Sequence, residues 1–233
     1  MHMKINENLA DIRTRIARAA QKSGRKPEDI TLIGVTKTIG VDHIGALLDC
    51  GVGAIGENRV QELLQKYDSF TNRAIPPSWH LIGHLQTNKV KYIIDKVAMI
   101  HSVDSIKLAE EIDRHAKKIG KYMDVLIEVN VGGEESKFGI CPKEVYEFSG
   151  ELVKFTNIRL RGLMTVAPFV QKSEENREIF KKMRHLVIDI AGKMSNNEKT
   201  ELSMGMTNDY EVAIEEGATM IRIGTGIFGE KDA

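Results

Sequence analysis

The stretch 31–38, TLIGVTKT, decides how the rest of the chain is understood. Leu32, Ile33 and Val35 belong to a short apolar run, which is too short for a helix and is typical of a buried strand. The apolar run leads to Lys37, so we expect this lysine at the tip of the strand. Its stem should be packed, and its amine should lie at the opening of the sheet or barrel that the strand helps to form. A partly desolvated amine attacks carbonyl groups readily. Taken alone, the position better suits a lysine that simply marks where a strand meets water.

A repeating unit begins here, consisting of an apolar run, a loop and a helical pattern. After the run that ends on Lys37, further strands are expected at 53–56, 79–82, 97–101, 124–130, 158–164, 201–204 and 219–223. Strands that alternate with helices form a parallel sheet, and eight repeats over about 200 residues match a closed (β/α)8 barrel of the TIM type. An open, doubly wound sheet is the alternative, because periodicity does not show whether a sheet closes.

One helical pattern precedes the first strand. Apolar residues recur at helical spacing from Ile5 to Ala19, which predicts an amphipathic helix that ends near Gly24. We expect the segment 1–26 to pack on the barrel as an extra N-terminal helix. No linker rich in Pro or Ser divides the chain, so residues 1–233 are expected to form one domain.

Several helix ends are predicted from residues that satisfy free backbone groups. Asp42 suits the N-cap and Gly51 the C′ position of a helix over 41–50. Asp104 is expected to cap the helix after the fourth strand. Asn208 and Glu211 resemble a capping box. Other helices are expected at 59–67, at 86–94, around 179–190 and at 208–216.

Composition excludes several classes of protein. The 33 basic and 33 acidic residues balance, so no overall field draws the chain to nucleic acid or to a membrane surface. No run approaches 18 apolar residues, and the N-terminus has no signal-peptide core, so no membrane span is expected. Cys50 and Cys141 are far apart and fit no metal motif, which favours free thiols in a reducing compartment. We therefore expect a cytoplasmic protein without a metal site.

Polar or small residues recur where the apolar runs end. A (β/α)8 barrel carries its chemistry at the carboxyl ends of its strands, so these residues are the candidates for a ligand site. They are Lys37, Glu57, Asn58, His84, Asp104, Asn130, Thr165, Ser203, Met204, Arg222, Gly224 and Thr225.

The loops after the last two strands resemble a phosphate site. Loops at these positions of a barrel often bind phosphate through backbone N–H groups. Ser203 begins the first loop, and Gly224, Thr225 and Gly226 form the second. Small residues let the backbone approach an anion, while the hydroxyls add donors. Each loop alone would pass for an ordinary turn, and it is their combination that indicates phosphate.

Arg222 lies between Ile221 and Ile223 on the eighth run, where a guanidinium is poorly tolerated without a partner. We expect it to point into the barrel mouth, either toward an acceptor on a ligand or toward a buried carboxylate such as Glu57. If Arg222 faced solvent instead, its two apolar neighbours would point inward.

A lysine suited to a Schiff base and a phosphate site together favour a phosphorylated aldehyde as the ligand. Pyridoxal phosphate fits this description, and an inward Arg222 would lie near its pyridine nitrogen. A sugar-phosphate aldolase with a Schiff-base lysine fits nearly as well from the residues alone.

Six motifs decide between these readings: GVTKT at 34–38, IGENRVQE at 55–62, WHLIGHLQTNKV at 79–90, EVNVGGEESKFG at 128–139, RGLMTVAP at 161–168 and LSMGMTNDYEVAIEEGATMIRIGTGIFG at 202–229. With these, the sequence resembles the pyridoxal-phosphate homeostasis proteins, single-domain relatives of the N-terminal domain of alanine racemase. The likeness covers nearly the whole chain. The family often has Ser where this chain has Thr36.

The resemblance implies a role for each matching residue. It makes Lys37 the lysine that holds pyridoxal phosphate as an internal aldimine, and it places Arg222 at the ring nitrogen. It implies that Ser203, Gly224 and Thr225 bind the phosphate group. Further residues that the resemblance places around the cofactor are Asn58, His84 and Met204.

The resemblance also implies a carrier that serves the supply of this form of vitamin B6, without established catalysis. An amino-acid racemase is the alternative. Racemisation needs an acid or base on each face of the substrate carbon, and in the racemases the second group is a tyrosine from another domain. All five tyrosines here lie on expected helices or just after them, and an arginine at the ring nitrogen weakens the electron sink. We therefore expect no catalytic residue, a monomer, and apo forms of pyridoxal-phosphate enzymes as possible recipients.

The remaining expectations concern residues outside these loops. His80 and His101 lie among apolar residues and are expected to be hydrogen-bonded core histidines. The segments 167–173 and 195–199 should be loops. The polar segment 132–139 is expected to act as a lid from which Lys137 can take the aldehyde during release, although an exposed loop with a solvated lysine fits equally well.

Overall fold

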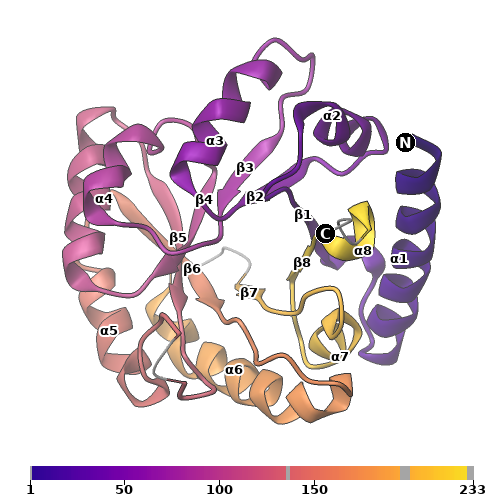
Figure 1. Ribbon diagram of the computed structural model, residues 1–233. Helices are drawn as coiled ribbons and strands as arrows, with labels where there is room; N and C mark the ends of the chain where they lie inside the picture. Colours follow the sequence, from indigo (N-terminus) through magenta and orange to yellow (C-terminus); the bar gives the residue numbers. More distant parts are fainter. Residues whose placement is uncertain (1, 135–136, 195–199, 230–233) are drawn as a thin grey trace.

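Eight parallel strands close into a barrel in the computed structural model, which describes residues 2–134, 137–194 and 200–229 (Figure 1). The strands are β1 (Thr31–Val35), β2 (Ala54–Glu57), β3 (Ser78–Leu81), β4 (Met99–Val103), β5 (Met123–Glu128), β6 (Ile158–Met164), β7 (Glu201–Ser203) and β8 (Met220–Ile223). Each strand pairs with the next, and β8 pairs with β1, where Ile33 lies beside Arg222. The predicted barrel is confirmed, and the open sheet is wrong.

A ring of helices surrounds the barrel (Figure 1). The α-helices are α1 (His2–Lys22), α2 (Val41–Asp49), α3 (Val60–Tyr67), α4 (Ile106–Lys118), α5 (Val145–Leu152), α6 (Arg177–Ile190), α7 (Tyr210–Glu215) and α8 (Thr225–Phe228). Shorter 3₁₀ segments are η1 (Pro27–Asp29), η2 (Asp68–Phe70), η3 (Thr87–Tyr92), η4 (Pro142–Glu144), η5 (Ser173–Asn176) and η6 (Ala191–Lys193). Helix α1 packs against α2, α7 and α8, and so covers the outside of the barrel where β8 meets β1.

The apolar side chains form two layers. The larger core fills the space between the strands and the surrounding helices. A small cluster inside the barrel consists of Ile33, Met99, Leu126, Met164 and Met220. Because side chains alternate along a strand, the residue two positions further along a strand also points inward. Two positions beyond Met99, Leu126 and Met220 lie His101, Glu128 and Arg222, which form a polar layer above the apolar cluster, toward the carboxyl ends of the strands.

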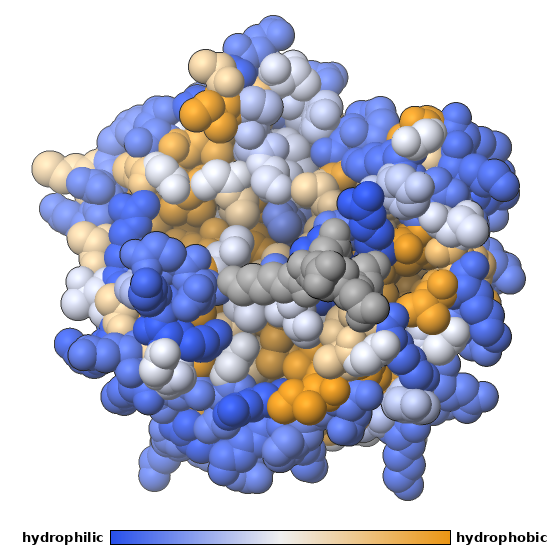
Figure 2. Space-filling model, turned by 180° about the vertical axis from the view of Figure 1, so that it is seen from behind, coloured by the Kyte–Doolittle hydropathy of each residue, from blue (hydrophilic) through white to orange (hydrophobic). Residues whose placement is uncertain are grey.

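The opposite face of the molecule, at the amino ends of the strands, is shown in Figure 2. Hydrophilic side chains dominate the periphery of this face, and apolar groups are scattered between them.

The clearest differences from the sequence prediction concern the fourth strand and one predicted helix. The fourth strand is Met99–Val103 rather than 97–101, because its pairing with β3 begins only where His80 lies opposite Met99. The segment expected as a helix over 86–94 is the 3₁₀ segment η3. The loop at 167–172 has no helix or strand, and the expected loop at 195–199 lies outside the described residues.

Three predicted caps are wrong. Ser105 caps α4, since its Oγ accepts from Leu108 N, whereas Asp104 lies beside a histidine of the barrel mouth. Gly40 precedes α2, and Asp42 lies within the first turn. Asp209 is the N-cap residue of α7, so Asn208 and Glu211 form no capping box. Gly51 has a φ of 81°, the left-handed conformation expected directly after a helix.

Candidate cofactor-binding site

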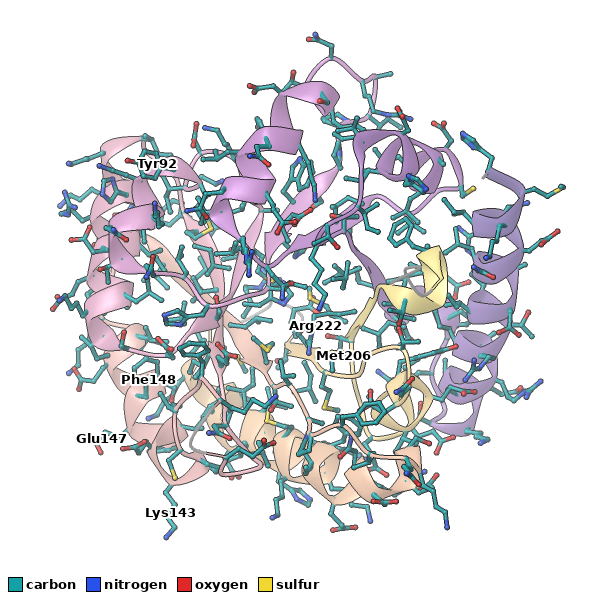
Figure 3. The ribbon with its side chains drawn as sticks, in the orientation of Figure 1. Tyr92, Lys143, Glu147, Phe148, Met206 and Arg222 are labelled. Carbon is teal, nitrogen blue, oxygen red and sulfur yellow. The ribbon has the colours of Figure 1, made fainter. Side chains whose placement is uncertain are left out.

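A cavity of about 290 Å³ lies at the carboxyl ends of β1 and β8. Four of the eight predicted site residues line it, namely Lys37, Arg222, Gly224 and Thr225. The loop after β6 closes one side with Phe169, and the loop after β7 supplies residues 206–209. Figure 3 shows Arg222 and Met206 near the centre of the ring of helices. Barrel closure thus brings the first and the eighth strand to one site.

Lys37 lies two residues beyond the end of β1 and is exposed. Its neighbour Thr36 is fully buried and donates to Gly56 O through its backbone N–H. The expectation of a packed lysine stem is therefore wrong, because the strand ends before the lysine. Lys37 nevertheless lines the cavity.

Arg222 points into the barrel and is only 3% exposed. Its Nη1 donates to Ser203 Oγ at 2.6 Å, and its Nη2 donates to Thr165 O at 2.7 Å. Burial lowers the pKa of Arg222 to about 10, and the carboxylates of Glu128 and Asp209 oppose this shift. The guanidinium therefore stays charged near neutral pH and offers a fixed positive group at the cavity wall.

Glu57, the alternative partner for Arg222, lies elsewhere. Ala54 of β2 contacts the cluster inside the barrel, so the alternation of the strand turns Glu57 outward toward α3. There it accepts from Lys66 Nζ at 2.6 Å and from Thr36 Oγ1 at 2.5 Å. The expected pairing of Arg222 with Glu57 is therefore wrong. The alternative of a solvent-facing Arg222 is also wrong, because this side chain is buried.

A hydrogen-bonded chain supports Arg222 from inside the barrel. Ser203 Oγ lies 3.0 Å from His101 Nδ1, His101 Nε2 lies 2.9 Å from His80 Nδ1, and His80 Nε2 lies 3.2 Å from Ser78 Oγ. Burial lowers the pKa of His80 to about 4. The pKa of His101 falls well below its usual value, through burial and then the charges of His80 and Arg222. As predicted, both are hydrogen-bonded core histidines, and both are neutral at pH 7.

Ser203 and Met204 are fully buried and lie outside the lining of the cavity. The Ser203 hydroxyl is engaged by Arg222 and His101. Met204 is part of the apolar core between strands and helices. The contacts that the resemblance implies for these two residues stay predictions.

The loops after β7 and β8 are joined by Thr207. Its Oγ1 accepts from Gly226 N at 3.2 Å and from Thr225 Oγ1 at 3.1 Å. A Cβ on Gly226 would lie 3.1 Å from Thr207 Cγ2, and one on Gly224 would lie 3.3 Å from Val35 O. Glycines let the two loops approach each other. Thr207 was not singled out from the sequence, although a hydroxyl in the loop after the seventh strand is a recognisable signal.

Asn58 and His84 lie beyond the lining of this cavity. Asn58 Oδ1 is buried and has no hydrogen-bond partner among the described residues. His84 stacks on Phe138, with 3.8 Å between ring centroids, and its Nδ1 lies 3.5 Å from Asp104 Oδ2. The segment that carries Lys137 therefore contacts the barrel mouth through Phe138. Both site assignments stay predictions.

Glu128 at the end of β5 was missed by sequence reasoning. It is 8% exposed, and its Oε2 has no hydrogen-bond partner among the described residues. Burial, and then the charge of Asp104, raises the pKa of Glu128 to about 7, while Arg222 opposes the shift. The barrel mouth thus holds a carboxyl group that titrates near neutral pH, which only the inward register of β5 reveals.

Within residues 2–134, 137–194 and 200–229, no group of three or more His, Cys, Asp or Glu side chains could hold a metal ion. Within the same ranges, no helix combines the length and the apolar character needed to span a bilayer.

Comparison with known proteins gives the family. A family model of the alanine racemase N-terminal domain matches residues 8–232. A pyridoxal phosphate homeostasis protein of Aquifex aeolicus is 45% identical over 232 residues, covering 98% of this chain and 99% of its own. The protein of the same name from Escherichia coli K12 is 37% identical over 231 residues, covering 98% and 97%.

A solved structure extends the likeness to three dimensions. PipY of Synechococcus elongatus, with PLP bound, has a TM-score of 0.83 and 32% identity, covering 97% of this chain and 100% of that one. Matches of this length and identity confirm the resemblance in the six motifs: the chain belongs to the alanine racemase N-terminal domain family and, within it, to the pyridoxal phosphate homeostasis proteins.

Proposed function

We propose that this protein binds pyridoxal 5′-phosphate (PLP) and takes part in maintaining its supply inside the cell. The observation that carries the proposal is the convergence of an amine, a buried guanidinium and a hydroxyl-lined loop on one cavity. Lys37 approaches from β1, while Arg222 and Thr225 approach from β8. The PLP-bound PipY relative supports the same ligand.

The residues present fit each part of this ligand. The backbone N–H groups and the hydroxyl of the Gly224–Thr225 loop suit a phosphate, and the charged Arg222 suits a ring nitrogen that accepts a hydrogen bond. When bound, PLP would supply an aldehyde whose carbon condenses with the Lys37 amine, forming a C=N bond and releasing one water. Asn58, His84, Ser203 and Met204 are proposed to surround these contacts.

We also propose that the protein is a carrier and not an enzyme. Racemisation needs a second acid or base opposite the lysine. None of the five tyrosines, all of them within the described residues, lines the cavity. Tyr210 is the buried one, and burial raises its pKa to about 12, so the phenol stays protonated near neutral pH and cannot accept a proton from a substrate. Apo forms of PLP enzymes are the proposed recipients, and a monomeric, single-domain protein in the cytoplasm is the proposed form.

Borohydride trapping tests this proposal. The purified protein is incubated with PLP, reduced, digested and mapped by mass spectrometry. We expect the adduct on Lys37, with loss of both adduct and yellow colour in Lys37→Ala. Lys181→Ala, on an exposed face of α6, is the matched control and should behave like the wild type. An undiminished chromophore in Lys37→Ala, with the adduct mainly on another lysine, would overturn the assignment.

A further inference from the structure

We propose that Glu62 and Lys66 of α3, together with Glu57 of β2, are positioning residues that hold the main chain on both sides of Lys37. The proposal rests on the proposed function, because it concerns how the cofactor lysine is presented. The exposed side chain of Lys37 provides little of its own anchoring, so the direction of its amine depends on the backbone that carries it.

The first contact holds the residue before the lysine. Lys66 Nζ donates to Thr36 O at 2.7 Å and to Glu57 Oε1 at 2.6 Å. Thr36 Oγ1 donates to the same carboxylate oxygen at 2.5 Å. Thr36 is therefore held through its carbonyl and its hydroxyl, both within a fully buried residue.

The second contact holds the residue after the lysine. Thr38 N donates to Glu62 Oε2 at 2.7 Å. Thr38 has a φ of 61°, the left-handed conformation, which is unfavourable for a β-branched residue. A conformation of this kind persists only where surrounding contacts impose it. The hydrogen bond to Glu62 is such a contact, and it lowers the pKa of the Glu62 carboxyl.

Lys66 joins the two contacts into one cluster. Besides Glu57, it lies 3.5 Å from Glu62 Oε2, one helical turn away on α3. The Lys66 side chain is 10% exposed and that of Glu57 is fully buried. Burial raises the pKa of Glu57, and the hydrogen bonds from Lys66 and Thr36 oppose this.

Stability alone does not account for this cluster. A buried ion pair gains little over apolar residues of similar size. Glu57 Oε2 is also buried without a hydrogen-bond partner among the described residues. Each of the three charged side chains forms a hydrogen bond with Thr36 or Thr38, the two neighbours of Lys37 in the turn that presents it. The structure therefore assigns them to the geometry of that turn.

The test compares two ligands that differ only at the reactive carbon. PLP can form a bond to Lys37, whereas pyridoxine 5′-phosphate carries an alcohol there and cannot. Loss of a charge-assisted hydrogen bond should weaken PLP binding about tenfold in Glu62→Ala and slow formation of the yellow adduct. Binding of pyridoxine 5′-phosphate should change less than about twofold. Glu62→Gln keeps an acceptor for Thr38 N and should recover most of the loss.

Glu178→Ala is the matched control, because Glu178 also pairs with a lysine along one helix but lies far from the turn. It should bind both ligands as the wild type does. Equal losses of both ligands in Glu62→Ala, or no loss of either, would overturn the positioning role. If the wild type itself formed no adduct on Lys37, the proposed function would fail instead, so the two failures are distinguishable.

A measurement on the unsubstituted protein covers the case in which a variant does not fold. The amide proton of Thr38 should shift with pH as Glu62 titrates, with a midpoint below the usual range of a glutamate. A Thr38 amide whose chemical shift does not follow an acidic group would contradict the contact on which the proposal depends.

Discussion

Thr225 Oγ1 donates a hydrogen bond to Thr207 Oγ1 at 3.1 Å, which joins the loop after β8 to the loop after β7. Thr207 Oγ1 also accepts from Gly226 N, so one hydroxyl organises both loops. Because Thr225 lines the cavity, its Oγ1 lies beside the position proposed for the phosphate. Rotation of the two hydroxyls, so that Thr207 donates to Thr225, frees the Thr225 proton for that anion.

Thr225→Val should therefore weaken PLP far more than unphosphorylated pyridoxal. The substitution keeps the shape of the side chain and removes the hydroxyl. One charge-assisted hydrogen bond contributes roughly 1.5–3 kcal/mol, or about one to two decades in affinity. Titration of both ligands against wild type and variant measures this, with Thr71→Val, at an exposed position directly after η2, as a control. Equal losses for the two ligands would mean that the phosphate binds elsewhere.

Glu128 should make stability depend on pH. Its pKa in the folded protein, about 7, exceeds the ordinary value of 4.5. Between these values the folded state keeps a proton that the unfolded state has lost, so Glu128 lowers the free energy of unfolding as pH rises from about 4.5 to 7. Glu128→Gln lacks this decline, and its advantage over the wild type should grow to on the order of 2–3 kcal/mol at pH 8.

Urea denaturation of both proteins at pH 5 and pH 8 checks this prediction. Glu178→Gln serves as the control, because Glu178 lies on the exposed face of α6. A difference between Glu128→Gln and the wild type that is the same at both pH values would show that Glu128 ionises normally.

Lys137 is expected to affect release of the cofactor without affecting its attachment. Lys137 N donates to Glu134 O at 3.0 Å, and Asn130 Nδ2 donates to the same carbonyl at 2.8 Å, so this segment is tied to the end of β5. Lys137→Ala should slow transfer of PLP to an apo-enzyme and leave the Lys37 adduct intact. Lys143→Ala, at the outer edge of the molecule, is the control (Figure 3). Identical transfer rates for all three proteins would make Lys137 an ordinary surface lysine.

Exchange of α-hydrogens separates the carrier from a racemase. With PLP bound, the protein should promote no α-hydrogen exchange of common amino acids in deuterated water beyond that of free PLP. The reason is that the cavity lacks a tyrosine opposite Lys37 and has the charged Arg222 in its wall. Proton NMR of the amino acids measures the exchange. Sustained exchange that disappears in Lys37→Ala would indicate an enzyme.

Much of the fold could be predicted because the strands are short, mostly apolar runs that end on a polar or small residue or are followed by one within two positions. Ile158–Met164 is the sixth strand in the sequence prediction and in the structure alike. Lys37, Arg222, Gly224 and Thr225 could be grouped because closure of the barrel brings β1 and β8 together. The motifs GVTKT and IRIGTG therefore carried information on both the fold and the cavity.

Other features depend on which face of a strand a residue occupies. Glu57 and Arg222 both lie near strand ends, yet one points toward α3 and the other into the barrel. A shift of one residue in register exchanges these directions, and no periodic signal in such short strands determines it. The contacts of Ser203 with His101 and of Glu62 with Thr38 likewise join residues far apart in the sequence.

The pairing of β8 with β1 has a consequence for folding of the chain during translation. Translation delivers β1 early and β8 after all the other strands. Lys37 therefore has no contact with the residues proposed to bind the phosphate until the eighth strand has emerged. If the proposed site is correct, a nascent chain should bind PLP in it only after this point. Once bound, a ligand that contacts both strands would stabilise the pairing of β8 with β1 and raise the melting temperature of the folded barrel.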